Sequence, residues 1–173
     1  TDIYEIDGFE ADDIIGTVSR ISEKNNIESF IVTGDKDALQ LATEYTNVVI
    51  TKKGVSETAV YNEKAFIDEF GVTPTQFIDV KGLMGDKSDN IPGVPGVGEK
   101  TAFKLIQTYG SVEGVLSNID EISGKKLKEN LTTYSEQAIF SKKLATIMTE
   151  VPIDISLEDI KNKDSYDREK LKK

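Results

Sequence analysis

The sequence predicts an α/β fold with a mostly parallel sheet flanked by helices, followed by an all-helical module. In the first half, an amphipathic helix, a short apolar strand, a second helix and a further strand follow one another, as in the repeating unit of a parallel sheet. In the second half, apolar residues recur at helical spacing between helix caps, without a further strand. We therefore divide the chain into residues 1–85, residues 86–155 and a charged tail, residues 156–173, that we expect to be weakly ordered.

The first half is expected to begin with an amphipathic helix over residues 11–24, because Ile14, Val18 and Ile21 recur at helical spacing. A short apolar run then predicts a buried strand. The elements expected after the helix are a buried strand at 28–33, a short helix at 38–43, a strand at 47–52, a turn at Lys53-Gly54 and an edge strand at 58–61.

Capping residues mark the helices that follow. Asn62 caps a helix that ends at Gly71, and Thr73 with Pro74 begins the next helix, which ends at Gly85. The further helices are expected at residues 100–109, 111–116, 124–131 and 135–148.

The composition excludes several kinds of chemistry. The chain has no histidine and no cysteine, so it cannot contain a Ser-His-Asp triad, a histidine or thiolate zinc site, or a disulfide. Hydrolysis would have to use carboxylates, lysines and hard metal ions such as Mg²⁺ or Mn²⁺. No apolar run has the length of a membrane span and no signal peptide is present, so we expect a soluble, cytoplasmic protein.

The net charge of −10 comes entirely from the first half. Residues 1–90 carry 18 acidic and 8 basic side chains, whereas residues 91–173 carry 13 of each. Seven of the acids lie in three tight clusters, and bound divalent cations would neutralise part of their charge. An acidic solvated surface is the alternative interpretation.

The three clusters place carboxylates where a divalent metal can bind. The first cluster lies in the first turn of a helix, where the helix dipole alone also favours acids. The second follows a strand, and an N-cap role is the alternative for its first member, Asp35. The third has two carboxylates three positions apart in a turn, so they can converge on one point. The clusters are Glu10, Asp12 and Asp13; Asp35 and Asp37; and Asp86 and Asp89.

A glycine-rich turn precedes the helix at 100–109 and has the character of a phosphate-binding loop. A Walker loop is excluded because Glu99 separates Gly98 from Lys100, and the dinucleotide fingerprint is excluded because Thr101 replaces its third glycine. The turn is similar to the helix-hairpin-helix turn of DNA-binding proteins, which holds a backbone phosphate without reading bases. A helix start after a proline-rich loop is the alternative.

Three motifs together resemble one family. EADD at residues 10–13, TGDKD at 33–37 and GDKSDNIPGVPGVGEKTA at 85–102 are similar to those of the bacterial 5′-to-3′ exonuclease domain, usually the N-terminal part of DNA polymerase I. The resemblance covers residues 7–152 and implies a flap-endonuclease-like fold, related to PIN domains, with a helix-hairpin-helix-like module that binds duplex DNA. It also implies a bacterial, cytoplasmic protein with a polymerase domain in the same chain.

The resemblance implies hydrolysis of DNA phosphodiesters with two ions, Mg²⁺ or Mn²⁺. The first cluster would serve one ion and the other two clusters the second, with Asp12, Asp35, Asp37 and Asp86 as the catalytic carboxylates. The glycine turn would hold a phosphate of the uncleaved duplex and can also bind K⁺ through backbone carbonyls. The DNA-binding residues implied are Gly96, Gly98, Lys100, Thr101 and Lys104.

One departure from the family concerns the start of the chain. Family members begin with a strand that carries a metal-binding Asp and have an arch that threads the single-stranded 5′ end, and residues 1–9 match neither. We therefore expect an N-terminally truncated piece with impaired cleavage. The leading function is a structure-specific 5′ nuclease for DNA with a 5′ flap or nick, in replication and repair. The alternatives are a non-catalytic duplex-DNA-binding module and a Mg²⁺-dependent phosphatase, the latter suggested by residues 35–37 alone.

Overall fold

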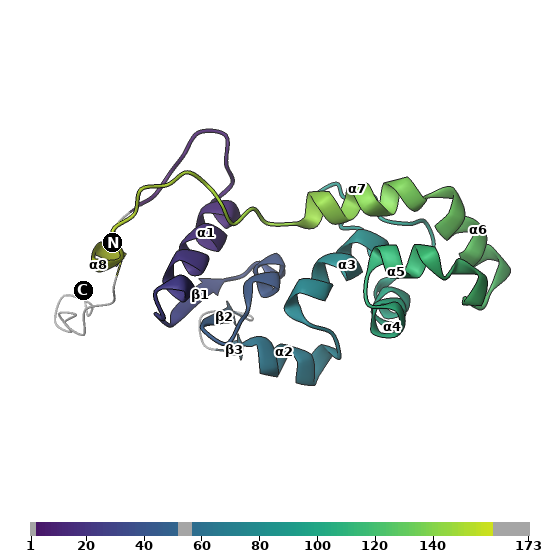
Figure 1. The fold of residues 1–173 in the computed structure, drawn as a ribbon, viewed down its shortest axis with the longest axis horizontal. Coiled ribbons are helices and arrows are strands. Elements are labelled where there is room, and N and C mark those ends of the chain that lie inside the picture. Colours follow the sequence, from purple (N-terminus) through teal and green to yellow (C-terminus); the bar gives the residue numbers. More distant parts are fainter. Residues whose placement is uncertain (1–2, 52–56, 161–173) are drawn as a thin grey trace.

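A mixed three-stranded sheet forms one end of the molecule in the computed structural model, which describes residues 3–51 and 57–160 (Figure 1). β1 (Ser29–Thr33) pairs with β2 (Thr46–Thr51) in parallel, and β3 (Thr58–Tyr61) pairs with the other edge of β2 in antiparallel orientation. The expected α/β architecture is confirmed, with one parallel and one antiparallel pair. The turn expected at Lys53-Gly54 lies outside the described residues.

Capping residues explain where several helices begin and end. Asn62 accepts a hydrogen bond from the backbone of Ala65, and Gly71 closes the same helix with φ of 68°. Thr73 and Gln76 form a capping box, with N–H to oxygen distances of 3.1 and 2.9 Å. The helices are α1 (Ala11–Lys24), η1 (Lys36–Leu41), α2 (Glu63–Phe70), α3 (Pro74–Met84), α4 (Glu99–Tyr109), α5 (Val112–Ser117), η2 (Ile119–Glu121), α6 (Lys125–Thr133), α7 (Ser135–Ala145) and α8 (Leu157–Ile160).

Helix α3 lies in the middle of the molecule, between the sheet at one end and helices α4 to α7 at the other (Figure 1). Its residues Val80 and Leu83 are fully buried. They belong to one hydrophobic core that extends from Val48 of the sheet to Ile106 of α4 and Leu131 of α6. The two halves of the chain therefore share a core, and α3 packs on both of them.

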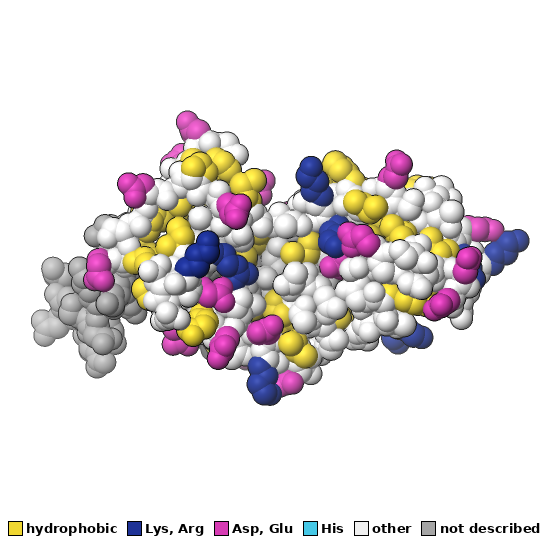
Figure 2. Space-filling view, in the orientation of Figure 1, with side chains coloured by type: hydrophobic (Ala, Val, Ile, Leu, Met, Phe, Trp, Pro, Cys, Tyr) yellow, Lys and Arg dark blue, Asp and Glu magenta, His cyan; other side chains and the backbone are white. Residues whose placement is uncertain are grey.

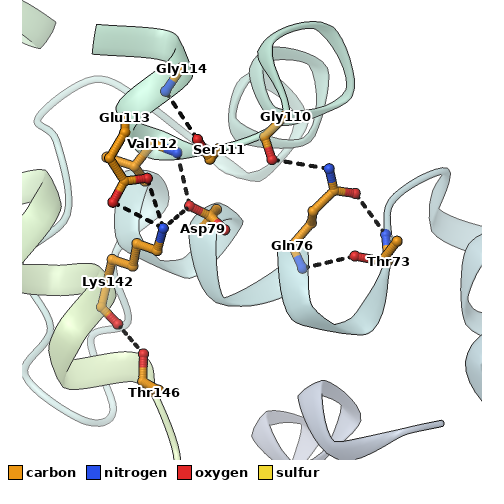
Figure 3. A network of polar contacts seen from close by, with 10 residues as sticks. All are labelled: Thr73, Gln76, Asp79, Gly110, Ser111, Val112, Glu113, Gly114, Lys142 and Thr146. Atoms are coloured by element: carbon orange, nitrogen blue, oxygen red, sulfur yellow. Dashed lines mark hydrogen bonds and ion pairs between the residues drawn. The ribbon is translucent and has the colours of Figure 1, made fainter. Parts of the chain in front are cut away.

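A buried ionic network fixes α3 to the helical half (Figure 3). Asp79 of α3 is buried and accepts a 2.9 Å hydrogen bond from the backbone N–H of Val112, at the start of α5. Lys142 of α7 lies 2.7 Å from the same carboxylate and 2.8 Å from Glu113. A buried carboxylate is stable only when it is paired and hydrogen-bonded, so this network sets where α5 and α7 pack on α3.

The segment after α7 returns along the molecule to α1 (Figure 1). Gln40 binds the start of this segment. The Gln40 side-chain amide donates a hydrogen bond to the carbonyl of Ala145 at 2.9 Å and accepts one from the N–H of Ile147 at 3.0 Å. Further along, the N–H of Val151 donates to the hydroxyl of Thr17 at 3.0 Å. These bonds explain why α7 ends at Ala145 and not at residue 148 as expected, because Gln40 satisfies the backbone groups at its end.

The expectation that the first strand is buried is wrong for two of its side chains. Phe30 and Val32 are 60% and 68% exposed, because they project from the face of β1 opposite to the buried Ile31 and that face is only partly covered. Beside them, an apolar groove of about 800 Å³ runs between β1 and α1, and Ile14 and Val18 line it from the helix side.

Two other expectations need adjustment. The short helix expected at 38–43 is a 3₁₀ helix that begins earlier, at Lys36. The tail expected to be weakly ordered contains α8 (Leu157–Ile160), and its residues 161–173 lie outside the described residues.

Replacing Gly93 by Ala tests the close backbone contact between Gly93 and Gly85. Gly93 has φ of 58°, and a Cβ atom there would lie 2.3 Å from the backbone nitrogen of Gly85. We expect Gly93→Ala to lower the free energy of unfolding by about 3 kcal/mol, measured by urea denaturation. Gly34→Ala is the control, because a Cβ at Gly34 meets only Thr51 Oγ1 at 3.7 Å. An equal loss in both variants would contradict the packing explanation.

Candidate metal and DNA site

The end of α3 leads into a tight turn that we call the carboxylate loop, residues 86–91. Asp86 and Ile91 close it with two backbone hydrogen bonds of 2.9 and 2.7 Å, and Asn90 inside it has φ of 56°. At its base, Gly85 and Gly93 lie so close that neither can carry a side chain. The loop geometry is therefore fixed by the backbone, and it presents Asp86 and Asp89 on the same side.

Three carboxylates from two distant segments converge at this loop. Asp37, at the start of η1, joins Asp86 and Asp89, and each can offer an oxygen atom within 4.8 Å of the others. Asp37 is held there because Asp35 caps η1 by accepting a 2.9 Å hydrogen bond from the N–H of Asp37. Three hard oxygen ligands at this spacing suit Mg²⁺ or Mn²⁺.

Lys81 is the one member of this group that sequence reasoning missed. Its ammonium lies 2.5 Å from Asp37 and also contacts Asp86, and its side chain is only 7% exposed. The available signal was its position: a lysine among the apolar residues of α3, two residues after Asp79 and five residues before Asp86. Only the fold shows that Asp37 lies on its other side.

Burial and hydrogen bonding shift the pKa values of this group in different directions. Hydrogen bonds from Lys81 and Ser88 lower the pKa of Asp86 to about 2, so this carboxylate stays charged. Burial raises the pKa of Asp37, although the hydrogen bond from Lys81 opposes that rise. Burial alone would lower the pKa of Lys81, but its bonds to Asp37 and Asp86 outweigh burial and raise it.

The first acidic cluster lies at the N-terminus of α1 and has mixed roles. Asp12 is the member that faces the other acids: burial raises its pKa, and the charges of Asp35 and Asp37 raise it further. Asp13 is occupied by the backbone, accepting hydrogen bonds from the N–H of Glu10 at 3.2 Å and of Met148 at 2.8 Å. Glu10 is the N-cap residue and is exposed. The structure thus brings Asp12 toward the second cluster and gives Asp13 a structural role.

The glycine turn lies on the surface at the start of α4. Val94 and Val97 anchor it in the core, while Gly96 and Gly98 are exposed. Asn130 of α6 supports it by donating a 2.7 Å hydrogen bond to the carbonyl of Pro95. Gly98 is the N-cap residue of α4 and offers no side chain to its first-turn N–H groups. These N–H groups and the positive end of the helix dipole favour an anion at this end of the helix.

The basic residues expected at this turn lie on the first two turns of α4. Lys100 and Lys104 are exposed and lie one turn apart on α4, and Thr101 between them is half-buried. Over the face shown in Figure 2, basic and acidic side chains are interspersed and do not form one continuous basic patch.

Both halves of the chain match the same family. Residues 1–71 match the model described as the 5′-3′ exonuclease N-terminal resolvase-like domain, and residues 72–168 match the 5′-3′ exonuclease C-terminal SAM fold. The chain belongs to the 5′-3′ exonuclease family. The two family models meet before α3, whereas the sequence division at residues 85 and 86 stays a prediction.

Two bacterial DNA polymerases I illustrate the sequence similarity. The chain is 52% identical to DNA polymerase I of Bacillus subtilis (strain 168) over 168 residues, and 40% identical to DNA polymerase I of Mycobacterium leprae (strain TN) over 164 residues. These matches cover 97% and 95% of this chain. The chain spans 19% and 18% of the length of these two relatives.

Solved structures of bacteriophage T5 proteins share the fold. A T5 5′-exonuclease with bound zinc ions superposes with a TM-score of 0.71 and 26% identity, over 82% of this chain and 51% of that one. A T5 flap endonuclease variant, in a pseudo-enzyme-product complex with DNA and metal ions, superposes with a TM-score of 0.70 and 25% identity over the same shares. Among the described residues, no helix is long and apolar enough to cross a membrane.

Replacing Asp12 by Asn tests the charge repulsion in the first cluster. The raised pKa of Asp12 means that its charged form destabilises the fold, and this penalty is present at pH 7 and is relieved as the pH falls through the raised pKa. With EDTA present, we expect Asp12→Asn to raise the free energy of unfolding at pH 7 by about 0.5 kcal/mol and to lose that gain near pH 3.

Urea denaturation at the two pH values measures the effect, and Asp7→Asn serves as a control that removes the same charge from an exposed position. A destabilised Asp12→Asn variant at pH 7 would show that the carboxylate makes a favourable contact instead.

Proposed function

We propose that this chain is the metal- and DNA-binding part of a structure-specific 5′ nuclease, which hydrolyses DNA phosphodiesters at 5′ flaps or nicks in replication and repair. One observation carries the proposal: Asp37, Asp86 and Asp89 converge within 4.8 Å, in a chain of the 5′-3′ exonuclease family. The relatives' names and the DNA complex of the T5 flap endonuclease support the same activity.

The acidic groups would hold two ions, Mg²⁺ or Mn²⁺. The chemistry of the donors fits, since all are carboxylates and the site already attracts the ammonium of Lys81. Such ions supply a water of lowered pKa and stabilise charge on the phosphate. Asp37, Asp86 and Asp89, with Asp35 beside them, would hold one ion, and Asp12 with Glu10 and Asp13 would serve the other.

The carboxylate loop and the glycine turn would have separate roles in positioning the DNA. The carboxylate loop would fix the distance between the metal ligands and the glycine turn, because the two are joined through Gly93. That turn would grip a phosphate of the uncleaved duplex through the amides near Gly96 and Gly98, with Lys100, Thr101 and Lys104 alongside, and its carbonyls would accept K⁺. The grip needs no base contacts, which suits a nuclease that recognises DNA structure.

We further propose that the chain works in the bacterial cytoplasm, joined to a polymerase domain as in its DNA polymerase I relatives. Cleavage by this stretch alone is expected to be slow, because the T5 relative extends well beyond the aligned part.

Cleavage of an end-labelled 5′-flap DNA tests the nuclease proposal. We expect products in Mg²⁺ or Mn²⁺ and none in EDTA, because the carboxylates need the ions to act on a phosphodiester. Asp35→Asn should reduce the rate by at least tenfold, since it removes one charge and keeps an oxygen that can still cap η1. The cleavage rate is measured from the labelled products on a denaturing gel.

Asp7→Asn is the matched control, because it removes the same charge from an exposed residue outside the clusters. Binding of flap DNA without cleavage in any metal would favour the non-catalytic DNA-binding module, and equal cleavage in EDTA would contradict a metal mechanism.

Replacing Lys100 by Met tests the phosphate grip separately from cleavage. We expect weaker duplex binding, independent of sequence, and a salt dependence of log K reduced by about 1, because one phosphate contact is lost. Fluorescence anisotropy in EDTA at several salt concentrations measures it. Lys64→Met, on exposed α2, is the control and should change neither quantity. Identical binding by both variants would rule out the turn as the grip.

A further inference from the structure

Lys81 occupies an unusual place for a buried lysine. Its side chain is 7% exposed, and its ammonium contacts Asp37 on one side and Asp86 on the other. These are two of the three carboxylates whose oxygen atoms lie within 4.8 Å of one another. The ammonium therefore lies against the oxygen atoms that would bind a divalent cation.

The surrounding bonds hold Lys81 in this place. Its backbone is in α3, within the core, and its carbonyl accepts a 2.8 Å hydrogen bond from Gly85, at the base of the carboxylate loop. Asp86 is fixed in turn by the N–H of Ser88, at 2.9 Å. The lysine stem is flexible, however, so the ammonium can leave the two carboxylates while the backbone stays in place.

We propose that Lys81 is a built-in counter-ion of this site, which neutralises Asp37 and Asp86 when no metal is bound and which a divalent cation must displace. The inference rests on the proposed function, because it assumes that these carboxylates bind metal. An ammonium and a dication cannot share the same oxygen atoms without strong repulsion at these distances. The lysine thus lowers the affinity of the site for metal and stabilises the fold in its absence.

Replacing Lys81 by Met tests the competition, with Mn²⁺ alone as the probe. We expect Lys81→Met to bind Mn²⁺ on the order of tenfold more tightly than wild type, measured by isothermal titration calorimetry, because a competing charge is removed. In EDTA the variant should unfold at a lower temperature, because Asp37 and Asp86 lose their partner, and Mn²⁺ should raise that temperature more than in wild type.

Lys87→Met is the matched control. Lys87 lies within the carboxylate loop and is exposed, and among the described residues it has no ion pair, so its loss changes the net charge equally without freeing the ligands. Equal Mn²⁺ affinity in the two variants, or weaker binding by Lys81→Met, would overturn the inference. If wild type cleaves flap DNA in metal but the two variants bind Mn²⁺ alike, only the inference fails. If no protein binds Mn²⁺, the proposed function fails with it.

A second measurement uses the unmodified chain, in case Lys81→Met does not fold. Brief acetylation followed by mass spectrometry reports how accessible each lysine is. Lys81 should react slowly in EDTA and several-fold faster in saturating Mn²⁺, because the displaced ammonium becomes accessible, while Lys87 should react equally in both. Unchanged or slower acetylation of Lys81 in Mn²⁺ would overturn the proposal.

Discussion

Three ion pairs join helix α3 to the elements on both sides of it. Asp79 and Lys81 are two positions apart, so they point to opposite sides of the helix, and both are buried. Asp79 pairs with Lys142 of the helical half, and Lys81 pairs with Asp37 of η1 and with Asp86 of the carboxylate loop. A buried charge without a partner is costly, so in the absence of metal the fold favours arrangements that keep Asp79 and Lys81 paired.

Local signals in the sequence were sufficient for most of the fold. Caps such as Asn62, Thr73 and Gly71 depend only on neighbouring residues, and the helices appear where the caps predict them. Where tertiary contacts decide, the predictions differ from the structure. Gln40 ends α7 early from a position 105 residues away, and the exposure of Phe30 depends on which elements cover its face of the sheet. Neither can be inferred from a local window.

In the candidate site too, some features follow from the sequence and others depend on tertiary contacts. The family resemblance implied that Asp37, Asp86 and Asp89 are ligands of one ion, and the fold brings those three together. Spacing alone could not separate Asp12, which faces the other acids, from Asp13, which binds the backbone of Met148. Lys81 was missed because its partner Asp37 is distant in sequence, and a lone lysine in a helix is usually on the surface.

The segment after α7, which returns along the molecule to α1, affects the order in which the chain folds. Its hydrogen bonds join Thr17 to Val151, 134 residues apart, and Asp13 to Met148, 135 residues apart. Contacts between α3, α4 and α7 close much shorter loops, and loop closure costs entropy that grows with loop length. Helix α1 therefore gains these partners only after residues 148–151 have been synthesised, so a ribosome-bound chain would keep this helix incompletely docked until the segment after α7 emerges.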